Sequence, residues 1–200
     1  MGEREFAKRL QEELKEKLKK DKDYIVERGG NLLYKVTIDE NVQFKPDNPE
    51  YPKRSSFAFQ TDLLIAKKVI KDNKEVYLPL VVIETKYKSR KNNPPTTHEV
   101  LSYSTKAQMH KNIYPYLRYG LVIGGATKIP KRFFIHNLGF DFAYAMNKVE
   151  DKASLNDLFK IIKQQINNAL IMLNILENNY TIKTFNTILK IWTLENLNKK

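Results

Sequence analysis

Two apolar stretches of the chain, 56–70 and 75–88, are separated by the polar tetrapeptide 71–74. Both stretches are rich in β-branched and aromatic residues, which pack well on the pleated surface of a sheet. A short polar segment between two such stretches is typical of a hairpin turn. The pattern therefore predicts two antiparallel strands, and the fold must contain a sheet on which the other elements pack.

The first twenty residues are predicted to form an amphipathic helix, because apolar side chains recur at every fourth position among charged ones. These apolar residues are Phe6, Leu10, Leu14 and Leu18. Gly29-Gly30 then interrupts the chain and 31–38 is predicted to be a strand. The segment 45–54 contains three prolines, so we expect it to be a loop.

Two capping-box patterns mark further helices, since a Ser or Thr followed three residues later by an acid satisfies the free amides of a first turn. Thr96 with Glu99 predicts a helix to about residue 117, in spite of Pro115, and Ser154 with Asp157 predicts one to about 176. The segments 120–124 and 132–136 are predicted to be strands, and 184–197 a last helix. The resulting order is helix, three strands, helix, two strands and two helices, an α/β (α+β) fold with a mixed sheet.

A chain of 200 residues, 42% of them hydrophobic, is sufficient for one core. We therefore expect one domain, with a catalytic core over 1–150 and a helical pair over 151–200 that packs on this core or forms a dimer interface. No stretch has the roughly 18 apolar residues of a membrane span, and the N-terminus is charged, so we expect a soluble, cytoplasmic protein. The absence of cysteine excludes disulfides and thiolate metal sites.

The chain carries a formal charge of +12, from 35 Lys and Arg against 23 Asp and Glu. Such an excess favours a polyanionic partner, and nucleic acid is the first candidate, although a biased composition that keeps the protein soluble would give the same excess. Between Glu84 and Arg118 there are seven basic and two acidic residues. The candidates for contact with phosphates in this segment are Lys88, Arg90, Lys91, Lys106 and Lys111.

Asp62, Glu84 and Lys86 are the residues that suggest chemistry. Side chains alternate along a strand, so Glu84 and Lys86 share one face, and the hairpin brings Asp62 alongside. Two carboxylates and a backbone carbonyl, here that of Thr85, are hard oxygen ligands suited to Mg²⁺, and Lys86 could position or deprotonate an attacking water. The alternative is structural: Glu84 and Lys86 form an ion pair at a sheet edge, and Asp62 begins a bend.

In these residues the chain resembles the PD-(D/E)XK nuclease superfamily over roughly residues 3–137. The first acid of that motif corresponds to Asp62 and the Asp/Glu-x-Lys element to Glu84-Thr85-Lys86, while Gln60-Thr61 stand where the motif has a proline. The resemblance implies a restriction-endonuclease-like αβββαβ core. It also implies hydrolysis of double-stranded DNA to 5′-phosphate products, with Mg²⁺ held by Asp62, Glu84 and the Thr85 carbonyl and with Mn²⁺ able to substitute.

Two further site residues are suggested by the same resemblance. Many relatives place a glutamate of the first helix at the metal site, and Glu3 has the matching apolar spacing, with Glu5 and Glu13 as rivals. Some relatives carry a glutamine on the helix after the lysine strand, which corresponds to Gln108. The alternative is that each of these side chains is a solvated residue of its helix.

The expected function is thus that of a metal-dependent endodeoxyribonuclease. A type II restriction endonuclease, acting as a homodimer in a restriction system, is the leading hypothesis, because a dimer can cut both strands of a symmetric site. A Holliday-junction resolvase or repair nuclease of the same superfamily is an alternative. A non-catalytic, basic DNA-binding module is an alternative from another class.

Overall fold

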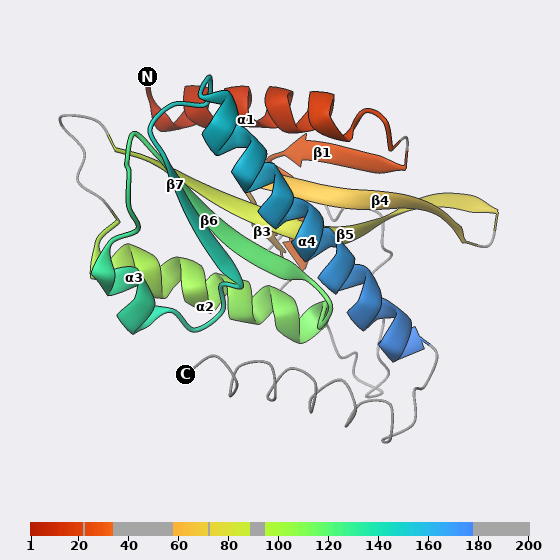
Figure 1. The fold of residues 1–200 in the computed structure, drawn as a ribbon. Helices are drawn as coiled ribbons and strands as arrows, with labels where there is room; N and C mark the ends of the chain where they lie inside the picture. The colour runs from red at the N-terminus through yellow and green to blue at the C-terminus, as the bar shows by residue number, and fades with distance from the viewer. Residues whose placement is uncertain (22, 34–57, 72, 89–94, 178–200) are drawn as a thin grey trace, which may run out of the picture.

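A five-stranded mixed sheet forms the centre of the structure (Figure 1). The structure is a computed structural model, and it describes residues 1–21, 23–33, 58–71, 73–88 and 95–177. The strands follow the order β1-β4-β5-β6-β7. The pairs β1–β4 and β4–β5 are antiparallel, while β6 and β7 run parallel to β5. Their bounds are β1 Tyr24–Arg28, β4 Leu63–Lys71, β5 Lys74–Tyr87, β6 Arg118–Gly124 and β7 Phe142–Met146. The α/β class expected from the sequence is confirmed at this level.

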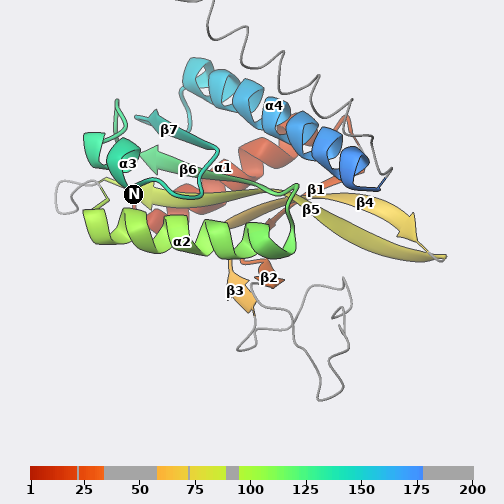
Figure 2. The ribbon, with the colours of Figure 1, turned by 90° about the horizontal axis from the view of Figure 1, so that it is seen from below.

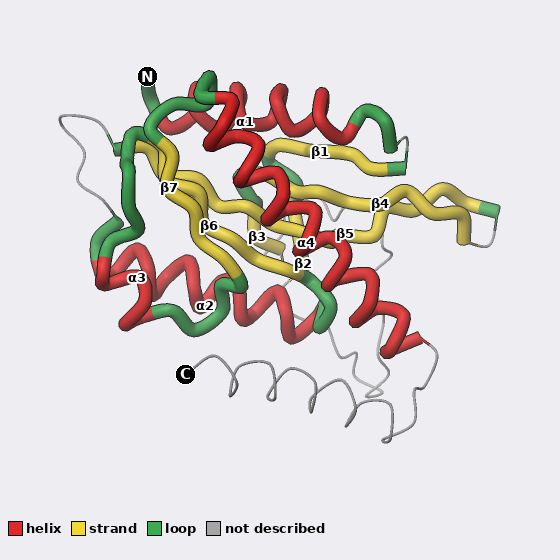
Figure 3. Tube along the Cα trace, in the orientation of Figure 1, coloured by secondary structure: helices red, strands yellow, loops and turns green. Residues whose placement is uncertain are grey.

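The predicted hairpin is formed by β4 and β5, whose pairing runs from Leu63 opposite Ile83 to Lys71 opposite Lys74. At the turn, Asn73 has a φ of 61°, a left-handed conformation that asparagine tolerates better than most residues. The register is interrupted once, after Ile65, where β5 contains one additional residue. Figure 3 shows the hairpin extending beyond the rest of the sheet.

The predicted first arm of the hairpin, 56–70, is interrupted at Thr61 and Asp62. The residues before this point form β3 (Ala58–Gln60), which pairs with β2 (Asn31–Leu33) in a separate two-stranded sheet. Two hydrogen bonds secure the junction: the Thr61 amide donates to Gly30 O at 2.8 Å, and the Gly29 amide donates to Asp62 O at 3.2 Å. The predicted strand 31–38 is therefore described only over β2, and its remainder lies outside the described residues.

Helices cover both faces of the main sheet (Figure 2). On one face, the apolar stripe of α1 (Glu3–Leu18) and the buried side of α4 (Lys152–Glu177) share a core with the sheet. On the other face, α2 (Thr97–Ile113) and the short α3 (Lys131–His136) enclose a second core. The two cores are separated by the sheet, so Val81 and Ile83 of β5 belong to one core and Val82 to the other.

Three features of the helices correct the prediction. The segment 132–136 is helical, because α3 buries Phe133 against α2 and leaves Phe134 and Ile135 exposed. The helix α2 has the predicted capping box at Thr96 and Glu99, but it ends at Ile113, two residues before Pro115. The helix α4 begins at Lys152, where the Asp151 carboxylate accepts hydrogen bonds from the amides of the first turn, so Ser154 is not its cap.

The strands β1 and β7 were not predicted, and the predicted loop 45–54 and last helix 184–197 lie outside the described residues. Among the described helices, none is both long and apolar enough to cross a membrane. The helix α4 packs on β5, β6 and β7, which places the described part of the predicted C-terminal helical pair on the core. Its possible role in a dimer stays a prediction.

Candidate active site

The alternation predicted for β5 is confirmed. Glu84 and Lys86 both meet side chains of α2, whereas Thr85 points to the opposite face, where it meets Asp62. The antiparallel register, which pairs Leu63 with Ile83, brings the backbone of Asp62 beside that of Glu84. The structure thus brings Asp62, directly before β4, beside Glu84 and Lys86 of β5, but Asp62 lies on the opposite face of β5 from the other two.

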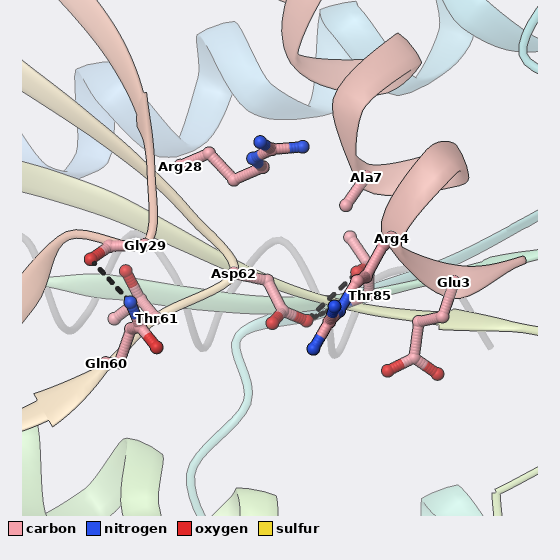
Figure 4. A pocket seen from close by; sticks show the side chains of 9 residues that line it. All are labelled: Glu3, Arg4, Ala7, Arg28, Gly29, Gln60, Thr61, Asp62 and Thr85. Atoms are coloured by element: carbon pink, nitrogen blue, oxygen red, sulfur yellow. Dashed lines mark hydrogen bonds between the residues drawn. The ribbon is translucent and has the colours of Figure 1, made fainter.

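Asp62 lies in the short connection between β3 and β4 and is fixed by Thr85. One carboxylate oxygen of Asp62 accepts hydrogen bonds from the Thr85 amide at 2.7 Å and from the Thr85 hydroxyl at 2.9 Å. Both residues line a pocket of about 470 Å³. Figure 4 shows Asp62 directed toward Thr85, with Gln60 and Thr61 on one side of the pocket and the start of α1 on the other.

Glu84 is buried, with 2% of its side chain exposed. Its Oε1 accepts hydrogen bonds from the ammonium of Lys106 and from the hydroxyl of Tyr119, both at 2.7 Å. Burial raises the pKa of Glu84, the positive charge of Lys106 opposes this rise, and the negative charge of Asp62 adds to it.

The structural alternative required an ion pair between Glu84 and Lys86. Lys86 pairs with other residues instead. Its ammonium lies 3.4 Å from the Glu3 carboxylate and 3.3 Å from that of Glu99, and over the ring of Tyr103. Burial alone would lower the pKa of Lys86, but the hydrogen bond and charge of Tyr103 and the two carboxylates raise it above its ordinary value. Lys86 is thus held in its charged form by acids of two different helices.

Glu3, at the start of α1, lies beside the predicted site residues. Glu3 lines the pocket that contains Asp62 and also contacts Lys86. Its rivals lie elsewhere: Glu5 accepts a hydrogen bond from Arg9 at 2.8 Å, and Glu13 is exposed on the helix. Two basic residues that the sequence did not single out, Arg4 and Arg28, line the same pocket.

Other predicted residues are not brought to this site. Gln108 is exposed, and its side-chain amide donates to Asn112 at 3.2 Å. This agrees with the alternative that Gln108 is a solvated residue of its helix. Lys111 is bound to Asp141 and to the Gly139 carbonyl. Lys88 is exposed directly after β5, whereas Arg90 and Lys91 lie outside the described residues.

Three of the residues that contact Glu84 and Lys86 lie on one stripe of α2, together with the buried His110. Glu99, Tyr103, Lys106 and His110 follow each other at intervals of four, three and four, which places them on one face of a helix. That face packs toward the sheet, so three polar residues and a tyrosine stand where apolar ones are usual. The spacing was visible in the sequence and was a signal for these partners.

The donor set suits a hard divalent cation, because Asp62 and Glu84 supply carboxylates and the neighbouring backbone supplies carbonyls. An ammonium, that of Lys106, already lies between the Glu84 carboxylate and the Gln60 carbonyl, so these oxygens do hold a cation. Within the described ranges, no three side chains of the His, Cys, Asp or Glu kind gather closely enough to form a metal site. Mg²⁺ commonly uses one or two carboxylates together with water and phosphate oxygens, and Asp62 and Glu84 are acids of this kind.

The sequence was compared with protein-family models and with curated proteins, and it matches none of either.

Proposed function

We propose that this protein is a Mg²⁺-dependent endonuclease that hydrolyses phosphodiester bonds in double-stranded DNA. The observation that carries the proposal is that Asp62, just before β4, lies beside Glu84 and Lys86 of β5, next to a pocket that Glu3 also lines. Glu84 and Lys86 pair with other residues rather than with each other, which removes the ion pair of the structural alternative.

The charge of the molecule supports an anionic substrate. The chain as a whole carries +12, and Arg4 and Arg28 line the same pocket as Asp62. A polyanion gains affinity from such charges by releasing its counterions. Phosphate groups of a DNA backbone would therefore be drawn to the surface on which the acids lie.

Each site residue has a role that follows from its surroundings. Asp62, Glu84 and the backbone carbonyl of Thr85 would hold Mg²⁺, which supplies an activated water and neutralises phosphoryl charge. Thr85 keeps Asp62 in position through its amide and hydroxyl. Lys86 remains protonated beside Glu3 and Glu99, so its role is to orient the attacking water or to offset phosphate charge rather than to accept a proton.

The test is cleavage of plasmid DNA by the purified protein with Mg²⁺, with Mn²⁺ and with a chelator. Asp62→Ala and Lys86→Ala should abolish cleavage. The matched controls are Glu16→Ala and Lys19→Ala, which remove an exposed acid and lysine that pair at 3.4 Å at the C-terminal end of α1. The controls should cut at the rate of the unmodified protein. Full cleavage by both site variants would refute the assignment.

One observation favours a second candidate, the non-catalytic basic DNA-binding module. Glu84 is satisfied by Lys106 and Tyr119, so its carboxylate has a structural role even without a metal. This alternative predicts DNA binding that weakens with salt. It also predicts that the unmodified protein shows no Mg²⁺ binding that depends on Asp62. Calorimetry with Mg²⁺ alone separates the two functions.

Within the nuclease proposal we favour a homodimeric type II restriction endonuclease, with α4 as one candidate surface for dimer formation. A resolvase or repair nuclease of the same superfamily is the alternative. Digestion of a long natural DNA distinguishes them, because discrete fragments indicate sequence recognition and cleavage confined to branched substrates indicates a resolvase. Sedimentation of the free protein tests the dimer.

A further inference from the structure

The ammonium of Lys106 lies against the Glu84 carboxylate, where a metal ion bound by that carboxylate would lie. Its Nζ lies 2.7 Å from Glu84 Oε1 and 2.6 Å from the Gln60 backbone oxygen. Lysine offers three donors and no acceptor, so two of its three N–H groups are used by these oxygens. Lys106 comes from α2 and Gln60 from β3, and the contact joins three separate elements around Glu84.

A buried carboxylate requires a counter-ion or a proton, because an isolated charge is poorly solvated in the protein interior. Lys86, the nearest lysine in sequence, does not meet this need, since its ammonium is engaged by Glu3 and Glu99. Lys106 is thus the cation that lies on Glu84 in this structure. A divalent ion that binds the same carboxylate would meet this positive charge at contact distance.

We propose that Lys106 is a built-in counter-ion of Glu84 that a divalent cation displaces when it binds. This inference rests on the proposed function, which makes Glu84 a metal ligand. The lysine has a path out of the site, because 17% of its side chain is already exposed and its four-carbon stem is flexible. Exchange of one cation for another keeps the buried carboxylate neutralised throughout.

The chain offers an internal control on the same helix. Lys111 is also 17% exposed and also donates to a backbone oxygen, that of Gly139 at 2.6 Å. Its ammonium lies 2.7 Å from an Asp141 carboxylate oxygen. Lys111 therefore has the same kinds of partners and the same access to solvent as Lys106, but it contacts neither Asp62 nor Glu84 in the described structure.

The test measures how fast each lysine amine is acetylated, by mass spectrometry of the full-length protein after digestion at acidic or aromatic residues. The reaction is run without metal and at a Mg²⁺ concentration that calorimetry shows to be saturating. Displacement predicts that Mg²⁺ makes Lys106 react severalfold faster, while the rate of Lys111 stays the same. Calorimetry on Lys106→Gln should show tighter Mg²⁺ binding than the unmodified protein, and Lys111→Gln should not.

The outcomes separate this inference from the proposed function. If Mg²⁺ binds and supports cleavage while Lys106 reacts at the same rate or more slowly, the counter-ion role is overturned and the nuclease proposal stands. If the protein neither binds Mg²⁺ nor cleaves DNA, both fail. If both lysines react faster, the metal loosens α2 as a whole, and selective displacement is refuted.

Discussion

Thr85 donates two hydrogen bonds to one carboxylate oxygen of Asp62, from its backbone amide at 2.7 Å and from its hydroxyl at 2.9 Å. The first bond is available to any residue other than proline, whereas the second requires a hydroxyl. The middle residue of Glu84-Thr85-Lys86 therefore does more than separate its neighbours. Its side chain lies on the face of β5 opposite to Glu84 and Lys86, and there it holds Asp62, the acid directly before β4.

Replacing Thr85 with valine tests this contact, because the two side chains have nearly the same shape. Thr85→Val should lower the free energy of unfolding by about 1 to 2 kcal/mol, since a part-buried carboxylate loses one donor. It should also weaken Mg²⁺ binding measured by calorimetry. Thr85→Ser retains the hydroxyl and should recover the metal affinity. A valine variant that matches the wild type in urea unfolding and metal titration contradicts the contact.

The strands that the sequence revealed and those that it did not differ in their place in the sheet. The central strands β4, β5 and β6 are buried on both faces over 63–66, 79–85 and 119–124, and these parts stand out as apolar runs. The two missed strands, β1 and β7, form the edges and have five residues each, most of them only partly buried. Edge strands need less apolar surface, so their sequences carry a weaker signal.

The site was predictable as far as local periodicity extends. Alternation placed Glu84 and Lys86 on one face, and the hairpin brought Asp62 beside them. The pairing of charges was not predictable in this way. Lys86 is two residues from Glu84, yet the partner of Glu84 is Lys106, which the fold brings from a different element. Closeness in sequence therefore does not tell which of the two lysines pairs with Glu84, because the packing of α2 brings Lys106 onto it.

Glu3 is predicted to act at the site, unlike the other two glutamates that the sequence offered. Glu3→Gln should slow DNA cleavage by about 10- to 100-fold, because it removes one acid that positions Lys86. Glu5→Gln breaks only an exposed pair with Arg9 and Glu13→Gln changes a solvated residue, so both should cut normally. Initial rates on one plasmid at saturating Mg²⁺ give the comparison. Equal rates for all three variants would remove Glu3 from the site.

Gly124 provides space for the side chain that anchors α1. A Cβ atom at this position would lie 2.5 Å from Cε2 of Phe6, which is fully buried. Gly124→Ala should therefore lower the free energy of unfolding by about 1 to 3 kcal/mol through overpacking. In a double-mutant cycle, Phe6→Leu should relieve part of this loss, because the smaller side chain makes room for the methyl group. Strictly additive effects in urea unfolding would show that the two positions do not meet.

His110 is predicted to make the protein sensitive to acid. Its ring is buried against Phe59 and Tyr119. Burial, and then the positive charge of Lys106, lower the pKa of His110 to about 3, against a smaller opposing contribution from the Leu32 backbone. The unfolded chain binds a proton near the ordinary pKa of about 6.5, whereas the folded protein does not.

Because the folded pKa is the lower one, the stability that neutral His110 permits is complete above pH 6.5 and is lost as the pH falls toward 3. Between pH 7.5 and pH 5 this amounts to about 2 kcal/mol of unfolding free energy. The pH dependence of the unfolding free energy is compared between the wild type and His110→Leu. Their difference gives the contribution of His110, since the other titrating groups are common to both. Urea unfolding at the two pH values should show the leucine variant losing about 2 kcal/mol less. Parallel losses in the two proteins would mean that His110 is protonated in the folded state.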